Sequence, residues 1–85
     1  ESPKTINKLN NALLIWDTKS IKSSVHKLRS PAAMMQVSSA VKLTEFIELN
    51  ISQEEQKEVV KIAIVDLISI INSVIKQAEQ FLELR

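Results

Sequence analysis

The sequence predicts an all-α fold, an antiparallel two-helix hairpin that pairs into a homodimeric four-helix bundle. The 85 residues include no glycine and two prolines, so the tight turns of a many-stranded β fold lack their usual residue. Apolar residues make up 45% of the chain, and they recur at helical spacing. A chain of this length forms one small domain, which we expect to span residues 1–85.

We expect the first helix over about residues 3–49. Pro31 lacks the N–H that would bond the carbonyl of Lys27, and the apolar pattern continues beyond it. The sequence therefore predicts one helix bent at Pro31 rather than two helices. Two rows of side chains spaced by seven form one stripe along it: Leu14, Ile21, Leu28 and Met35, and Val25, Ala32, Ser39 and Phe46.

A turn at about residues 50–52 and a second helix over about 53–84 complete the hairpin. Asn50 can end a helix in the left-handed conformation, and Ser52 followed by Glu55 fits a capping box. The apolar stripe of the second helix is wider than a single helix–helix seam, so we expect two chains to pair as a homodimer. Its main positions are Val60, Ile64, Leu67, Ile71, Val74, Ala78 and Phe81.

Composition and charge exclude several classes of function. The formal net charge is +1, which predicts no nucleic-acid partner and no direct membrane contact in this segment. Without cysteine there is no disulfide framework, and without glycine there is no phosphate-binding loop. One histidine among scattered carboxylates lacks metal-ligand spacing, so we expect no metal site. The chain begins at Glu1 rather than methionine, so we expect a longer parent protein.

The histidine, His26, is the strongest candidate functional residue. It lies beside the apolar stripe, between Val25 and Leu28, so its ring is expected to reach solvent. Lys22 and Ser30 share its helical face at four residues on either side. Residues 1–31 hold six basic and two acidic side chains. An exposed imidazole in basic surroundings is suited to receive an anion such as a phosphoryl group.

Residues 26–31 read histidine, lysine, leucine, arginine, serine and proline. This string resembles the phosphoacceptor motif of sensor histidine kinases. In that family the histidine is followed by an acidic residue, an apolar residue, arginine, threonine or serine, and proline. Five of the six positions agree in this chain, and the chain as a whole resembles the family's dimerisation and histidine-phosphotransfer domain. The matching string is His26, Lys27, Leu28, Arg29, Ser30 and Pro31, with Lys27 as the position that differs.

This resemblance implies a role for each matching residue. His26 would accept a phosphoryl group from ATP and pass it to an aspartate of a response regulator. Arg29 would support domain docking and charge placement, Ser30 would position a water for dephosphorylation, and Pro31 would bend the helix. ATP and Mg would be bound by a separate catalytic domain of the same protein, with no cofactor in this fragment. The resemblance implies a cytoplasmic location, including for a membrane-anchored parent.

Lys27 leaves other readings open. The family's carboxylate accepts a hydrogen bond from the imidazole, and a lysine ammonium can only donate. The protein could use another base, could mainly accept or remove phosphoryl groups, or could be a non-catalytic helical dimerisation scaffold. A stand-alone histidine phosphotransfer protein is a further alternative, because Arg29 follows His26 by three residues. Such proteins typically have a glycine after that basic residue and four helices in one chain.

Overall fold

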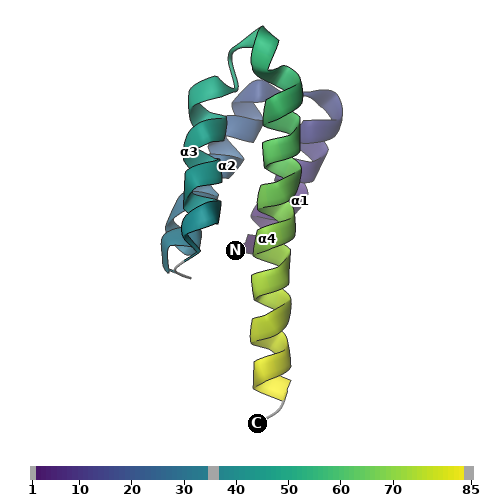
Figure 1. Ribbon diagram of the computed structural model, residues 1–85. Coiled ribbons are helices and arrows are strands. Elements are labelled where there is room, and N and C mark those ends of the chain that lie inside the picture. Colours follow the sequence, from purple (N-terminus) through teal and green to yellow (C-terminus); the bar gives the residue numbers. More distant parts are fainter. Residues whose placement is uncertain (1, 35–36, 84–85) are drawn as a thin grey trace.

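The structure, a computed structural model, describes residues 2–34 and 37–83, and the side chains of residues 4–34 and 37–80. Throughout this described part the fold is all-helical, as predicted, and no strand is present (Figure 1). The elements in chain order are α1 (Ser2–Ile15), α2 (Thr18–Met34), α3 (Ser38–Asn50), the 3₁₀ helix η1 (Glu54–Gln56) and α4 (Lys57–Glu83).

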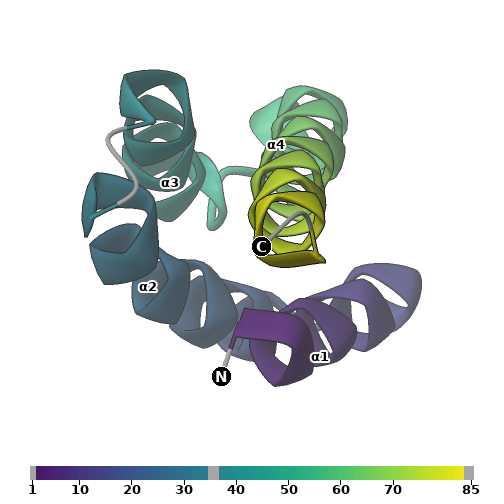
Figure 2. The ribbon, with the colours of Figure 1, turned by 90° about the horizontal axis from the view of Figure 1, so that it is seen from below.

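The four α-helices surround one apolar core. Helices α2, α3 and α4 run in alternating directions, and α1 lies on the side of α2 that faces α4 (Figures 1 and 2). Each α-helix contributes buried side chains, so the core is formed within a single chain. The largest fully buried side chains are Leu9, Ile21, Leu28, Ile47, Ile64, Leu67 and Ile71.

The expectation of one helix over about residues 3–49, bent at Pro31, is wrong. The chain forms three helices there, and α2 continues through Pro31 to Met34. The second change of direction follows Met34, so α3 returns along α2 and buries Ala40, Thr44 and Ile47. The expected two-helix hairpin is likewise replaced by four helices in one chain. Folding back lets the helices bury one another's apolar faces, which one long helix could not do.

The seven-residue spacing concealed both breaks. Ile21 and Leu28 are buried as expected, but Leu14 is 85% exposed because it lies at the end of α1. Met35, another member of that row, lies outside the described residues. A regular spacing thus continued in the sequence across a point where the backbone changes direction.

The first corner, Trp16–Asp17, joins α1 to α2 without an intervening loop. Trp16 has a φ of 53°, the left-handed conformation that usually requires glycine. Its N–H bonds the carbonyl of Leu13, and the N–H of Asp17 bonds that of Ala12, which is the Schellman pattern. Asp17 then begins α2, because its carboxylate accepts hydrogen bonds from the backbone N–H and the hydroxyl of Ser20. Asp17 therefore completes the end of α1 with its N–H and caps the start of α2 with its carboxylate.

Trp16 also connects this corner to α4. The ammonium groups of Lys57 and Lys61 lie 5.3 and 5.6 Å from the centre of the indole ring. Both distances are within the range of a cation–π interaction, and such an interaction stabilises an exposed site by about 0.5–1 kcal/mol. The contact offsets part of the cost of placing a bulky residue in the left-handed conformation, about 1–2 kcal/mol.

The last corner, between α3 and η1, is built differently from the prediction. Asn50 is the last residue of α3 and is not left-handed; its side-chain amide donates to the carbonyl of Phe46 at 2.9 Å. Ser52 does not cap the following helix, because Gln53 occupies that position and makes no side-chain cap hydrogen bond. Ile51 is buried at this corner. An apolar anchor thus holds the turn where a capping box was expected.

Helix α4 has a buried side, an outer side and a projecting end. Val60, Ile64, Leu67 and Ile71 are buried, as their spacing predicts. Its 27 residues span about 40 Å, whereas the 13 residues of α3 span about 20 Å. The C-terminal part of α4 therefore extends past the other helices (Figure 1). Among the described helices, none combines the length and apolar character needed to cross a membrane.

Candidate functional site

His26 lies on the solvent-facing side of α2. The opposite side of this helix is held in the core by Ile21, Val25, Leu28 and Ala32. This burial fixes the rotation of α2 about its axis, so the residues between the buried positions must face outward. The side chain of His26 is accordingly 69% exposed. The ring is therefore accessible to a large reaction partner.

Helix α3 places a carboxylate against this ring. Nδ1 of His26 lies 3.4 Å from Oε1 of Glu48, whose side chain is only 18% exposed. That distance is slightly too long for an N–H···O hydrogen bond, and Oε1 is buried without a hydrogen-bond partner in the described structure. The histidine and the glutamate are therefore neighbours across the α2–α3 interface.

A second ion pair follows on the same two helices. Nη2 of Arg29 lies 3.5 Å from Oε1 of Glu45, and both side chains are about half exposed. Because α2 and α3 run in opposite directions, three residues forward on α2 match three residues back on α3. We call His26, Arg29, Glu45 and Glu48 the α2–α3 edge. At this edge, His26 and Arg29 of α2 each lie against a carboxylate of α3.

A shallow depression surrounds His26 on its α2 side. Its volume is about 370 Å³, and α2 supplies all of its lining except Glu48. The lining side chains other than His26 and Glu48 are Lys19, Lys22, Ser23 and Lys27. Ammonium and hydroxyl groups are donors for phosphate oxygens, so this surface has the chemistry to receive a phosphoryl group.

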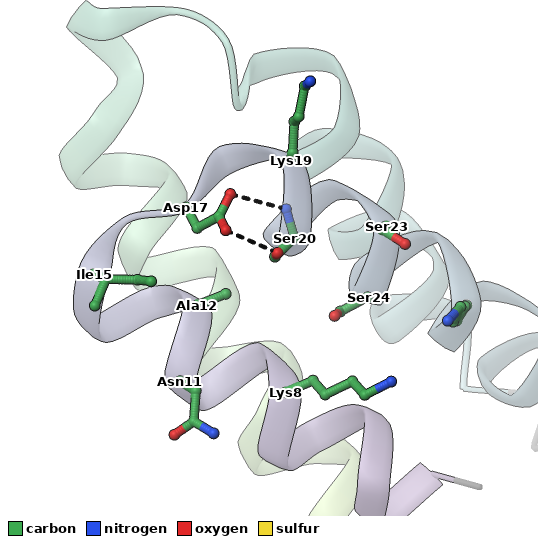
Figure 3. A pocket seen from close by; sticks show the side chains of 10 residues that line it. Lys8, Asn11, Ala12, Ile15, Asp17, Lys19, Ser20, Ser23 and Ser24 are labelled. Atoms are coloured by element: carbon green, nitrogen blue, oxygen red, sulfur yellow. Dashed lines mark hydrogen bonds between the residues drawn. The ribbon is translucent and has the colours of Figure 1, made fainter.

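A second depression of about 440 Å³ lies between α1 and α2 (Figure 3). It shares Lys19, Ser23 and Lys27 with the first, so the two depressions are neighbours on α2. Lys8 of α1 extends into the space beside Ser24 of α2 (Figure 3). The basic surface next to His26 is thus built from two helices rather than one.

Asp17 is the acidic residue of this second depression. The hydroxyl of Ser20, and then its backbone N–H, donate to the carboxylate and hold the pKa of Asp17 below its ordinary value of 3.8. The carboxylate is therefore ionised at neutral pH. It caps α2 while the lysines remain around it.

The other predicted site residues lie along α2 near His26. Ser30 is exposed one turn after His26, so the two share a face of the helix. Arg29 points to Glu45, and Pro31 is half-buried in the last turn of α2. The matching residues of the motif thus all lie on α2, and lysines line the surface next to His26.

Reasoning from the sequence missed Glu48. In a continuous helix over residues 3–49, Glu48 would lie about 33 Å from His26, because 22 residues separate them. The two meet only because the chain reverses between α2 and α3. Asp17 was also missed, although an aspartate followed by Thr18 and Ser20 is a readable helix start.

The described residues hold no group of three or more histidine, cysteine, aspartate or glutamate side chains that could bind a metal ion. Compared with protein-family models, curated proteins and solved structures, the chain matches none. The function is therefore inferred from the geometry and charge around His26.

Proposed function

We propose that this chain is a histidine phosphoacceptor domain of two-component signal transduction. The observation that carries the proposal is the exposed His26 on a helix whose neighbouring surface is lined by lysines and serines. The imidazole supplies the nucleophile, and the ammonium groups attract and neutralise a phosphoryl group. His26 takes the phosphoryl group from ATP and passes it to an aspartate on the receiver domain of a response regulator.

The remaining motif residues have supporting roles in this proposal. Ser30 shares the face of His26 and can hold a water for hydrolysis of the phosphorylated regulator. Arg29, paired with Glu45, stabilises the surface on which a partner domain docks. Pro31 leaves the carbonyl of Lys27 without its helical donor, which favours local bending near the site.

In the first form of the proposal, the chain is the dimerisation and phosphoacceptor domain of a sensor histidine kinase. ATP and Mg are then bound by a separate catalytic domain of the same protein, in the cytoplasm. The sequence motif from His26 to Pro31 supports this form.

In the second form, the chain is a histidine phosphotransfer protein that exchanges phosphoryl groups between aspartates of receiver domains. A core built from four helices within one chain favours this form, because such proteins are monomeric four-helix bundles. The absence of glycine and the presence of Pro31 two residues after Arg29 count against it.

The outer side of α4 supports the homodimer of the first form. Val59, Ile62 and Val65 are each about half exposed or more, and they lie on one side of the helix. Their side chains find no partner in the core, so a second copy of α4 is a chemically suitable cover. Each chain would then contribute a whole four-helix unit rather than a hairpin.

Phosphorylation of the chain tests the proposal. The chain is incubated with labelled ATP and its catalytic domain, and separately with a phosphorylated receiver domain. We expect acid-labile, base-stable label on the wild type and none on His26→Gln. Label only from ATP supports the kinase form, and label only from the receiver supports the phosphotransfer form. No label from either donor on a folded chain overturns the proposal and favours a helical scaffold.

A further inference from the structure

We propose that Glu48 is a positioning residue for His26: it holds a proton on Nδ1 and thereby makes Nε2 the nitrogen that accepts the phosphoryl group. This inference rests on the proposed function. It adds a residue from a different helix and a choice between the two ring nitrogens.

The buried carboxylate oxygen carries the argument. Oε1 of Glu48 is buried and has no hydrogen-bond partner among the described residues, which is costly for an ionisable acceptor. Nδ1 of His26, which can donate a proton, lies 3.4 Å from this oxygen. A small side-chain rotation brings this pair to hydrogen-bond distance, because the exposed ring of His26 is free to move.

The same contact selects the tautomer. Neutral imidazole carries one proton, and the nitrogen without it has a lone pair. A lone pair on Nδ1 would face the oxygen of Glu48 and repel it, so the proton belongs on Nδ1. The lone pair is then on Nε2, the nitrogen on the far side of the ring from Glu48.

The neighbouring lysines do not pair with Glu48 in the described structure. Within the described residues the ion-pair partner of Glu48 is His26, although Lys19, Lys22 and Lys27 line the same depression. These lysines lie on α2 with His26, whereas Glu48 approaches from α3. The carboxylate therefore acts on the ring, and the ammonium groups remain available for the incoming phosphoryl oxygens.

The transfer step balances with these groups. The Nε2 lone pair forms a bond to phosphorus, and the bond from phosphorus to the leaving group breaks with its electron pair on the leaving group, ADP when ATP is the donor. The proton on Nδ1 stays in place, so the phosphorylated ring is cationic. The carboxylate of Glu48 lies beside that new positive charge and stabilises it.

The first test is spectroscopic and needs no phosphoryl donor. Because His26 is the only histidine, imidazole ¹⁵N spectra report one ring. At a pH at which the ring is neutral, we expect the Nδ1–H tautomer in the wild type and a shift toward Nε2–H in Glu48→Ala. Glu79→Ala, which removes an exposed glutamate of α4, is the control and keeps the wild-type spectrum. An unchanged tautomer in Glu48→Ala overturns the inference.

The second test measures transfer with phosphoramidate, which phosphorylates histidine without a kinase and releases ammonia. We expect phosphate on Nε2 by ³¹P NMR, with a rate at least tenfold lower in Glu48→Ala than in Glu79→Ala. Glu48→Gln keeps an acceptor oxygen without charge, so it keeps the nitrogen selectivity and loses rate. It also replaces Glu48→Ala if that variant does not fold. Equal rates and selectivity in both alanine variants overturn the inference.

The two proposals fail differently. If the wild type takes no phosphoryl group from any donor but its tautomer depends on Glu48, the proposed function is wrong and the positioning by Glu48 stands. If the wild type is phosphorylated and Glu48 changes neither tautomer nor rate, the function stands and the positioning is wrong.

Discussion

The α2–α3 edge and the outer side of α4 are opposite kinds of surface on one small fold. At the edge, His26 and Arg29 on α2 each meet a glutamate from α3. On α4, apolar side chains including Ile62 and Val65 face outward, and the ion pair there, Lys61–Glu58, lies within the helix. Polar groups thus join helices at the first surface, whereas at the second surface apolar groups lack a covering element.

This difference separates chemistry from association. Charged groups held between helices can be oriented, and oriented groups are what a transfer reaction requires. Exposed apolar groups do not orient a reacting group, but burying them against a partner is favourable because it removes apolar surface from water. The chain therefore presents its candidate reactive face and its candidate contact face on different helices, so that both could be used at once.

Leu67→Ala gives the largest expected effect, because it tests the buried side of the same helix whose outer side is exposed. Leu67 is fully buried, and its truncation leaves a cavity, so we expect a loss of about 2–5 kcal/mol in the free energy of unfolding. Chemical denaturation followed by circular dichroism measures it. Ser69→Ala, exposed on the same helix, is the control and changes stability by less than about 0.5 kcal/mol. Equal effects of the two would contradict the observed orientation of α4.

Ile62→Lys tests the outer side directly. Ile62 is 64% exposed, so the folded chain tolerates the lysine, whereas a dimer contact would have to bury its charge. We expect the dimer dissociation constant to rise at least about tenfold, or about 1.4 kcal/mol. Sedimentation equilibrium measures it. Met34→Lys, an exposed apolar position at the end of α2, serves as the control. A wild type that is monomeric at all concentrations would rule out the dimer.

Asp17→Asn tests the capped start of the helix that carries His26. The lowered pKa of Asp17 means that the carboxylate stabilises the fold fully above its ordinary value of 3.8, and that this contribution is lost as pH falls through the lowered pKa. We expect the wild type to be more stable than the variant near neutral pH and the difference to shrink below about pH 4. Ser20→Ala removes the hydroxyl donor and should weaken the same pH dependence. A difference that grows in acid would contradict the cap.

Arg29→Ala gives the smallest expected effect and sharpens the description of the edge. Its pair with Glu45 is about half exposed, so a double-mutant cycle with Glu45→Ala should give about 0.2–1 kcal/mol at low salt and less at high salt. Thermal or chemical unfolding of the four proteins measures it. A coupling well above this range would mean that the edge holds α2 and α3 together rather than only orienting groups on their surface.

The helical class and the buried side of α4 could be read from the sequence, because both follow from the spacing of apolar residues. Val60, Ile64, Leu67 and Ile71 alternate at four and three residues, and all are buried. The rule fails beyond Ile71, where Val74 is half-buried and Ala78 is exposed, and the side chain of Phe81 lies outside the described residues.

The corners could not be read in the same way. The usual sign of a reversal is glycine, and this chain has none, so Trp16 takes the left-handed conformation instead. At the corner between α3 and η1 the polar residues that fit a capping box are not used, and Ile51 anchors the turn by burial. Tertiary packing overrode the local signals at both places.

Part of the candidate site could also be predicted from the spacing of apolar residues within one helix. The exposure of His26 follows from its neighbours in the helix, Val25 and Leu28, which are buried. Its partner Glu48 depends on how α3 returns along α2, and nothing local to either residue encodes that. Residues of one helix can be predicted together, whereas pairs across a reversal require the fold.

The unequal lengths of α3 and α4 have a consequence for local stability. Between Val60 and Ile71 one side of α4 is buried in the core, so we expect the amides there to exchange slowly with solvent. From Asn72 to Gln80 the side chains are half-buried or exposed, and a helical segment of that length is marginal by itself in water. Hydrogen exchange along α4 should therefore become faster toward its C-terminal end. A single helix would thus show both global and local opening.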